Sequence, residues 1–244
     1  MKMKRLISLV LAVSWLGGCG YYYFTGPLKP EEKQAESMNI ADDGTVSFIQ
    51  DRLEIHLKPM TDDELNRLFP NHSNAGPRST NPYTFGNTEF WAEEGEKTRF
   101  TVFRFSVKNY AYPKVKIDPA RIVLKSENKR EYWSLSFEQL DSYYRAYAIG
   151  YRGNEYERYQ ERRDLLRRTM FKNEEIFSGQ ETDGFVVFPA LHHDVSKIRV
   201  IVHDVVLRFD FRNEPIETTK IEYAFLRDIG RKYKDGTLEL SEAN

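Results

Sequence analysis

The alternation of apolar and polar residues after residue 45 is the feature that most limits how this chain can fold. Leu53, Ile55 and Leu57 alternate with polar neighbours, and Phe103 and Phe105 do so within a longer segment at 99–108. Successive side chains of a strand point to opposite faces, so the pattern predicts strands with one buried face. Further strands are predicted at 115–117, 122–124, 131–134, 184–188, 198–202, 205–211 and 221–225. No helices alternate regularly with these strands, which favours an antiparallel β-sandwich of eight or nine strands.

One segment, at about 137–172, interrupts the strands with a helical pattern. Residues 136–139 can cap a first helix, and glycines at 150 and 153 separate it from a second one. The second helix carries an apolar stripe with one arginine in it: Tyr156, Tyr159, Arg163, Leu166 and Met170. Its late basic residues suit the helix dipole and are Arg162, Arg163, Arg167, Arg168 and Lys172. They form either a solvated helix face, which is the simpler explanation, or a surface that binds anionic lipid or an acidic partner.

Ahead of the 99–108 strand, prolines and glycines divide the segment 70–97 too often for regular structure. A capping box at 61–64 predicts a short helix that ends at 68 or 69, just before this long loop. The loop carries Tyr83, Phe85, Phe90 and Trp91. Aromatic rings on a loop suit the flat faces of sugars, but the same rings also pin long loops to the domain beneath them. The first alternative predicts a sugar or peptidoglycan site at Tyr83, Phe85 and Trp91, and the second, more common one predicts buried rings.

The amino terminus has the parts of an export signal. Lys2, Lys4 and Arg5 precede an apolar stretch at 6–16, which is shorter than the roughly 20 residues that a membrane-spanning helix needs. The stretch ends in the sequence Leu-Gly-Gly-Cys at 16–19, and Cys19 is the only cysteine. This ending resembles the lipobox of bacterial lipoproteins. The resemblance implies that the Cys19 thiol receives a diacylglyceryl group, that the chain is cut before Cys19, and that acyl chains such as palmitate anchor the protein.

The same resemblance implies where the protein resides. Residues 1–18 would be a cleaved signal peptide and residues 19–44 a lipidated tether, because 26–43 contain two prolines and a polar run typical of a linker. Gly20, not Asp, follows Cys19, which in bacteria with two membranes favours the outer membrane, with the domain facing the periplasm. The aromatic run at 21–24 lies either among lipid headgroups or on the domain. With its one cysteine lipidated, the domain has no disulfide.

The strand pattern at 98–226 is similar to the immunoglobulin-like domains of secreted bacterial lipoproteins, chiefly at 103–109 and 179–188. The resemblance implies an immunoglobulin-like β-sandwich, although the Cys, Trp, Cys core of antibody domains is missing. It transfers no functional residue to this chain. We therefore expect one domain over 45–226 that contains the helical insertion, followed by a polar tail at 227–244.

Charge and motifs argue against several functional classes. Removing residues 1–18 takes away three of the 36 basic residues and no acidic one, so 33 remain against 37 acidic residues at a formal charge of −4. This balance does not suit nucleic acid. The sequence has no zinc-protease histidine pair, phosphate-binding loop or serine nucleophile elbow, so we expect no metal, cofactor or catalysis. We expect a non-catalytic assembly or interaction factor of the cell envelope, partnered by an envelope protein or anionic lipid; the alternative is a sugar-binding or peptidoglycan-binding module.

Overall fold

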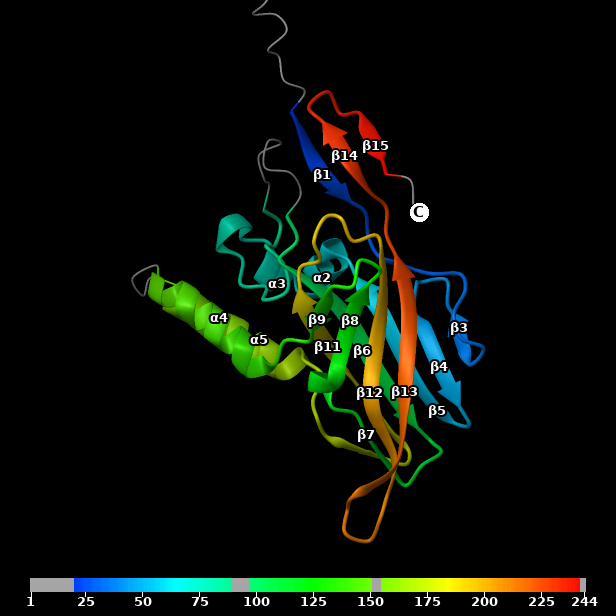
Figure 1. The fold of residues 1–244 in the computed structure, drawn as a ribbon. Helices are drawn as coiled ribbons and strands as arrows, with labels where there is room; N and C mark the ends of the chain where they lie inside the picture. Colours follow the sequence, from blue (N-terminus) through cyan, green and yellow to red (C-terminus); the bar gives the residue numbers. More distant parts are fainter. Residues whose placement is uncertain (1–19, 89–96, 151–154, 242–244) are drawn as a thin grey trace, which may run out of the picture.

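The computed structural model describes residues 20–88, 97–150 and 155–241, which form fifteen strands in three antiparallel sheets (Figure 1). The first sheet has the order β11 (Gln180–Pro189), β6 (Phe100–Asn109), β5 (Leu53–Met60), β4 (Val46–Gln50) and β3 (Met38–Ile40). The second has the order β10 (Glu175–Phe177), β7 (Lys114–Lys116), β12 (Lys197–Phe209), β13 (Pro215–Leu226) and β2 (Lys29–Pro30). Strand β8 (Ile122–Ser126) also pairs with β12, and β9 (Glu131–Trp133) pairs with β8.

The first and second sheets pack face to face around one apolar cluster, which we call the sheet core. Along β5 every second residue is buried, as the alternation predicts. The ring of Phe103 lies 5.3 Å from the ring of Phe225 on the opposite sheet, measured between centroids. The hydroxyl of Tyr223 crosses the core and donates to the carbonyl of Ile55 at 2.9 Å. The prediction of a mainly β, antiparallel fold is confirmed.

Strand β12 corrects one sequence-based boundary. The segments predicted as two strands, 198–202 and 205–211, form one strand that ends at Phe209 and contains a bulge. Its pairing with β13 shifts between Val202 and Val205, and Asp204 has a φ of 53°. The bulge moves the buried phase from even to odd positions, so Val205 and Leu207 still face the core. Phe211, expected in a strand, lies in the turn after β12 and is 90% exposed.

Residues within 21–40 and 229–240 form strands that the sequence did not predict. Strand β1 (Tyr21–Thr25) pairs with β14 (Ile229–Tyr233), which pairs with β15 (Leu238–Leu240), and these three strands form what we call the terminal sheet. Strands β2 and β3 also lie in the segment expected to be a tether. Segments 19–44 and 227–244 therefore contain strands where linker and tail were expected. The partners lie about 200 residues apart in the chain, so no local pattern reports their pairing.

Helices gather on one side of the first sheet (Figure 1). Helix α2 (Asp62–Leu68) begins at the expected capping box, where Thr61 and Glu64 hydrogen-bond each other's backbone N–H groups. Helix α3 (Pro70–Ser73) and a short 3-10 turn at 76–78 follow it. Helices α4 (Phe137–Gly150) and α5 (Tyr156–Thr169) form a hairpin within the expected 137–172 insertion. No helix in the described part of the chain combines the length and apolar character that spanning a membrane requires.

Candidate functional site

The α4–α5 hairpin covers the outer face of β6 and β11, and a second apolar cluster forms there, which we call the helix core. Near this end of the two strands both faces are buried: Phe103 faces the sheet core, whereas Val102 and Val187 face the helices. The covering layer supplies Leu65, Tyr83, Leu140, Tyr144, Ala148, Tyr159 and Leu166. The two segments predicted as separate candidate sites, 70–97 and 137–172, therefore meet in one layer.

Hydrogen bonds fix the loop after α3 beneath the hairpin. The hydroxyl of Tyr144 donates to the carbonyl of Pro82 at 2.5 Å. The hydroxyls of Tyr83 and Thr169 share a hydrogen bond of 2.5 Å, and the Tyr83 ring packs 5.0 Å from that of Phe185. Burial raises the pKa of Tyr83 above its ordinary value. Tyr83 is fully buried, so the prediction that it offers a stacking surface is wrong, and the alternative of a pinned loop is confirmed for this residue.

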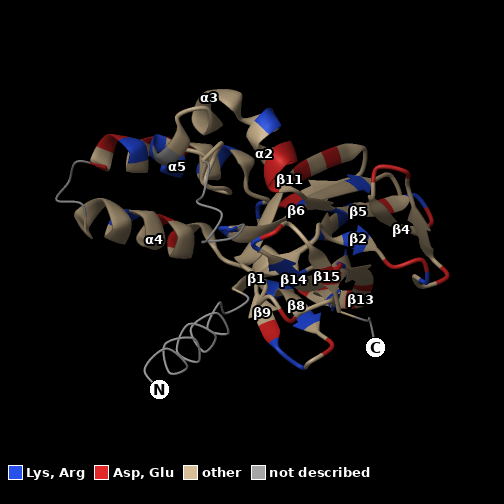
Figure 2. Cartoon of the chain, turned by 90° about the horizontal axis from the view of Figure 1, so that it is seen from above, with Lys and Arg blue, Asp and Glu red and all other residues tan. Residues whose placement is uncertain are grey.

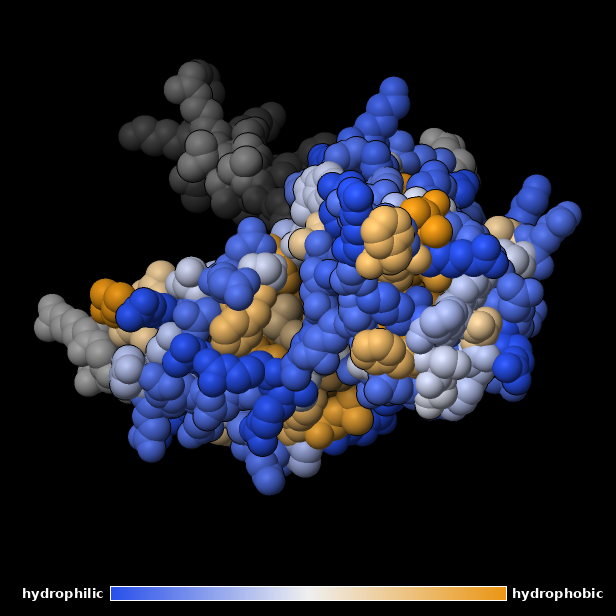
Figure 3. Space-filling model, turned by 90° about the horizontal axis from the view of Figure 1, so that it is seen from below, coloured by the Kyte–Doolittle hydropathy of each residue, from blue (hydrophilic) through white to orange (hydrophobic). Residues whose placement is uncertain are grey.

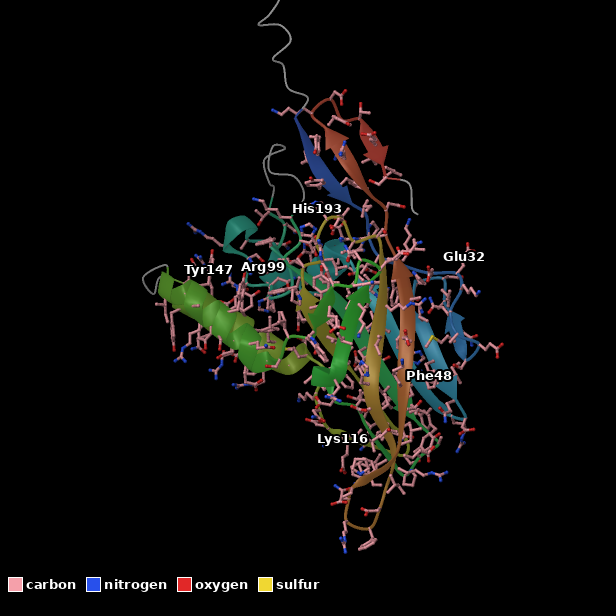
Figure 4. All side chains as sticks on the ribbon, in the orientation of Figure 1. Glu32, Phe48, Arg99, Lys116, Tyr147 and His193 are labelled. Atoms are coloured by element: carbon pink, nitrogen blue, oxygen red, sulfur yellow. The ribbon has the colours of Figure 1, made fainter. Side chains whose placement is uncertain are left out.

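Arg99 lies beside α4 (Figure 4), where it contacts both Phe85 of this loop and Tyr144 of the helix. The Arg99 guanidinium lies 4.3 Å from the centroid of the Phe85 ring, and its Nη1 donates to the Tyr144 hydroxyl at 3.0 Å. Phe85 is half-buried, and its ring lines a cleft described below. Phe90 and Trp91 lie outside the described residues. Of the predicted stacking residues, Phe85 is the one that the described structure leaves in contact with solvent.

Arg162 corrects the prediction of a five-residue basic surface. It is 3% exposed, its Nη2 donates to the carbonyl of Ser79 at 2.6 Å, and its guanidinium lies 5.3 Å from the Tyr144 ring. Nε and Nη1 have no hydrogen-bond partner among the described residues. Desolvation lowers the pKa of Arg162 from its ordinary value. The helix is rotated from its expected orientation, so Arg162 faces the core and Arg163 pairs with Asp141 of α4 at 3.1 Å.

The three remaining basic residues, Arg167, Arg168 and Lys172, are exposed. Charges of both signs alternate along α5 (Figure 2). Lys172 lies 3.9 Å from Glu174, an exposed pair of little energetic weight. Within the described residues Arg167 and Arg168 make no ion pair. The predicted basic surface therefore exists at the carboxyl end of α5, reduced to three residues.

Two of these basic residues, Arg167 and Lys172, line an apolar cleft of about 500 Å³ between the end of α5 and the β9–α4 connection, which we call the α5 cleft. Arg167 is one of its lining residues, and its guanidinium lies 5.7 Å from the Phe137 ring. The other apolar lining residues are Pro119, Ala120, Leu135, Leu166, Met170, Phe171, Phe185 and Val186. Seen from below, hydrophobic residues lie between the hairpin and the sheets (Figure 3). The cleft can hold an apolar group while Arg167 and Lys172 contact an anionic one.

A close backbone approach fixes the floor of the α5 cleft. The chain leaving α5 crosses β11, where the Phe171 N–H donates to the carbonyl of Phe185 at 3.0 Å. A Cβ placed on Gly184 would lie 2.4 Å from the Phe171 nitrogen, so a residue without a side chain is required there. The carboxylates of Asp118, Glu138 and Glu174 also line the cleft. The rim thus carries both signs of charge around an apolar floor.

A second cleft, of about 650 Å³, lies between α2, the loop at 85–88 and the segment after β1. It is lined by Asp62, Asp63, Asn66, Phe85, Lys97 and Arg227 among others. Desolvation, together with the neighbouring charge of Asp63, raises the pKa of Asp62 to about 6. Sequence reasoning treated Asp62 as a helix start only. The residues that line the cleft with it, among them Gly26, Phe85 and Arg227, come from distant segments that no local pattern places beside Asp62.

The densest histidine cluster in the sequence, 192–194, belongs to the β11–β12 connection. His192 Nδ1 lies 2.7 Å from Asp194, whose carboxylate also accepts two hydrogen bonds from Arg130. Burial opposes ionisation of Asp194, but these hydrogen bonds outweigh it and lower the pKa of the carboxyl group. Within the described ranges no group of three or more His, Cys, Asp or Glu side chains could hold a metal ion. This cluster is therefore an exposed hydrogen-bonded network.

Cys19 lies outside the described residues, whose first member, Gly20, leads directly into β1. Of the sites expected from the sequence, the structure thus describes a reduced basic surface beside an apolar cleft and a loop whose described rings are largely buried. Comparison of the chain with family models, with curated proteins and with solved structures found no match.

Proposed function

We propose that this chain is an envelope lipoprotein, anchored through lipid on Cys19 to the outer membrane and facing the periplasm, that acts without catalysis as an assembly or interaction factor. Its partner is an envelope protein, which places an apolar side chain in the α5 cleft and a neighbouring carboxylate on Arg167. The observation that carries this proposal is the position of exposed Arg167 and Lys172 at an apolar cleft. An apolar anchor surrounded by charge is typical of protein interfaces.

The packing of two antiparallel sheets around the sheet core supports a further part of the proposal, an immunoglobulin-like form of β-sandwich. The connections of such a sandwich tolerate long insertions, and the α4–α5 hairpin lies between β9 and β10 in chain order. An experimental structure whose strand order is compared with that of immunoglobulin-like domains tests this assignment.

In-cell photocrosslinking tests the partner. A photoreactive amino acid replacing Arg168, the exposed neighbour of Arg167 on α5, is expected to give an adduct with one envelope protein. The same amino acid at Lys220, an exposed residue of β13, serves as the control. The adduct should map to a segment with an apolar residue beside Asp or Glu, and it should be lost in the Arg167→Glu background. Adducts of equal yield at both positions, or none at 168, would contradict a docking site in the cleft.

The anchor has its own test. Replacing Cys19 by Ser removes the nucleophilic sulfur, so we expect the precursor to remain unlipidated and uncut at this site. Mass spectrometry of the mature amino terminus compares the variant with the wild-type chain. An unmodified Cys19 after cleavage elsewhere in the wild-type chain would overturn the lipoprotein proposal.

A second candidate function, binding of sugar or peptidoglycan, is favoured by the lining of the second cleft. Asp62, Asp63 and Asn66 offer carboxylate and amide groups beside the accessible ring of Phe85, a combination that suits hydroxyl-rich sugars. Sedimentation with purified peptidoglycan tests it. Wild-type protein should co-sediment and Asn66→Ala with Phe85→Ser should not, while Tyr110→Ser, an exposed residue elsewhere, should behave as wild type.

A further inference from the structure

The terminal sheet has apolar side chains on both faces and joins neither core. Tyr21 is 42% exposed, Tyr23 51%, Leu238 43% and Leu240 51%. In the described part of the chain, no residue of β1, β14 or β15 belongs to the sheet core or the helix core. A small sheet without a covered apolar face is only marginally stable in water. The Tyr23 ring stacks on His193 of the body, whereas Tyr21, Leu238 and Leu240 remain open to a surface outside it.

Basic groups surround these exposed rings. The Arg231 guanidinium lies 4.8 Å from the Tyr21 ring, and the Lys232 ammonium lies 5.8 Å from the Tyr22 ring. Lys234 lies beside Gly20, since a Cβ placed on that glycine would be 2.9 Å from the lysine Cε. Tyrosine rings mixed with Lys and Arg are the composition that proteins present to the headgroup layer of a membrane.

The connection to Cys19 is short. Only Gly20 separates Cys19 from the first residue of β1. Two residues of extended chain span at most about 7 Å, so Tyr21 cannot lie farther than that from the Cα of Cys19. A lipid on Cys19 would therefore bring β1 directly to the bilayer surface, without a flexible tether in between.

We propose that the terminal sheet is the surface on which the protein rests against phospholipid headgroups. This proposal rests on the lipid anchor at Cys19. The ring of Tyr21 lies at headgroup level, and Arg231 and Lys234 contact lipid phosphates. Because β1 is paired along its whole length with β14, and the Tyr23 ring stacks on His193 of the body at 3.6 Å, the sheet transmits this orientation to the domain.

The resulting orientation directs the long axis of the molecule away from the membrane. The terminal sheet and the β12–β13 turn lie at opposite ends (Figure 1). Strand β13, with 12 residues, alone spans about 40 Å. The exposed Phe211 and Ile216 near that turn are therefore held far from the bilayer. In this orientation the α5 cleft, at the side of the domain, is open to the periplasm.

Depth-dependent quenching of a fluorophore on the full chain tests this arrangement. Lipidated protein is reconstituted in vesicles of phosphatidylethanolamine and phosphatidylglycerol that contain a headgroup-attached nitroxide lipid. The fluorophore is attached to a new cysteine at Asp235, in the β14–β15 turn, or at Asn213, in the β12–β13 turn. Lipidation consumes the Cys19 thiol, so the added cysteine is the one reactive thiol. We expect at least fivefold stronger quenching at 235 than at 213.

A paired set of variants separates the terminal sheet from the anchor. Tyr21→Ser with Lys234→Ser should reduce quenching at 235 at least twofold while the protein still floats with the vesicles. The control, Tyr110→Ser with Lys220→Ser, removes an equally exposed ring and a lysine from elsewhere and should change nothing. Lipidated protein that floats with the vesicles but shows equal quenching at 235 and 213 would overturn the proposal. Crosslinking of two chains through residue 235 would also overturn it, because the sheet would then face a second copy.

Failure of the anchor gives a different result. If Cys19 carries no lipid, the chain without added cysteines takes up the fluorophore at Cys19 and stays in the aqueous fraction. That outcome would overturn both the anchor and the seating of the terminal sheet. If that chain takes up no label and floats with the vesicles, the lipid anchor is established, and the quenching measurements can then be interpreted.

Discussion

The sheet core and the helix core share strands β6 and β11 but are held together differently. Between the sheets, alternating aliphatic and aromatic side chains fill the space, and Tyr223 makes one hydrogen bond across it. Under the hairpin, Tyr83, Tyr144 and Arg162 bring polar groups into the interior, and each is hydrogen-bonded to another segment of the chain. Apolar packing thus sets the stability of the first region, whereas the second also depends on specific polar contacts that fix one arrangement of loop and helices.

The largest effect should come from a cavity in the sheet core. Phe105 is fully buried, and its ring lies 4.8 Å from that of Phe171. Phe105→Ala is expected to reduce the free energy of unfolding by about 3–5 kcal/mol, through lost burial and an unfilled cavity. Urea denaturation measures the loss. Phe211→Ala, at a residue that is 90% exposed, is the control and should change stability by less than about 0.5 kcal/mol. A small effect at 105 would mean that the sheets do not enclose this ring.

The next effect compares a buried tyrosine hydroxyl in each core. Tyr144→Phe leaves the Pro82 carbonyl and the Arg99 guanidinium without their partner, so we expect a loss of about 2–3 kcal/mol. Tyr223→Phe removes a single bond to the Ile55 carbonyl and should cost about 1 kcal/mol. Both variants are measured by the same urea titration. Equal losses would show that the helix core gains nothing special from its polar contacts.

This difference explains which parts could be predicted from sequence. Leu53, Ile55, Phe103 and Phe105 lie on the predicted buried faces because a strand's period is local and survives folding. The capping box at 61–64 could likewise be predicted, because it depends on residues that are three positions apart. By contrast, a rotation of α5 by part of a turn decides whether Arg162 or Arg163 faces the core, and that rotation depends on Ser79 and Asp141 elsewhere in the chain.

The candidate sites were predictable to a smaller degree. Arg167 and Lys172 lie on an accessible surface as expected, because charged residues late in a helix are favoured there whatever the tertiary structure. The cleft beside them could not be foreseen, since it forms where Phe137, Phe171 and Val186 meet from three separate segments. The pairing of β1 with β14 escaped prediction for the same reason: both segments are short, and their partners are at opposite ends of the chain.

The pH dependence of stability tests the environment of Asp62, which lies in α2, the helix that contributes Leu65 to the helix core. Because the pKa of Asp62 is raised to about 6 in the folded protein, the folded state holds an extra proton between roughly pH 4 and 6. The stability that Asp62 contributes therefore falls as the pH rises through this window. Partial solvent access reduces the effect to about 1 kcal/mol. Asp62→Asn should be more stable than wild type at pH 7 and equally stable at pH 4.

Urea titrations at the two pH values measure this difference. The matched control is Asp63→Asn, which removes the neighbouring negative charge but leaves Asp62 in place. It should keep the pH dependence of the wild-type protein in weakened form. An Asp62→Asn variant that follows the wild-type pH profile would mean that Asp62 is as solvated in the folded state as in the unfolded one.

The smallest effect on stability is expected where the helix core ends, at the exposed arginines of α5. Arg167→Glu with Arg168→Glu places negative charge at the carboxyl end of a helix and removes the contact of Arg167 with Phe137, so it should cost less than about 1 kcal/mol. Neither side chain is buried or ion-paired among the described residues, whereas Arg162, earlier in the same helix, is buried.

Association of this Arg167→Glu, Arg168→Glu variant with the acidic partner should nevertheless weaken strongly. The weakening should be larger at low salt, because exposed charges are screened as ionic strength rises. Envelope crosslinking at two salt concentrations measures this loss, and Arg167→Lys with Arg168→Lys preserves the charge as a control. Loss of binding in the Glu variant with retention in the Lys variant is expected; wild-type association in both would identify this surface as a solvated helix face without a binding role.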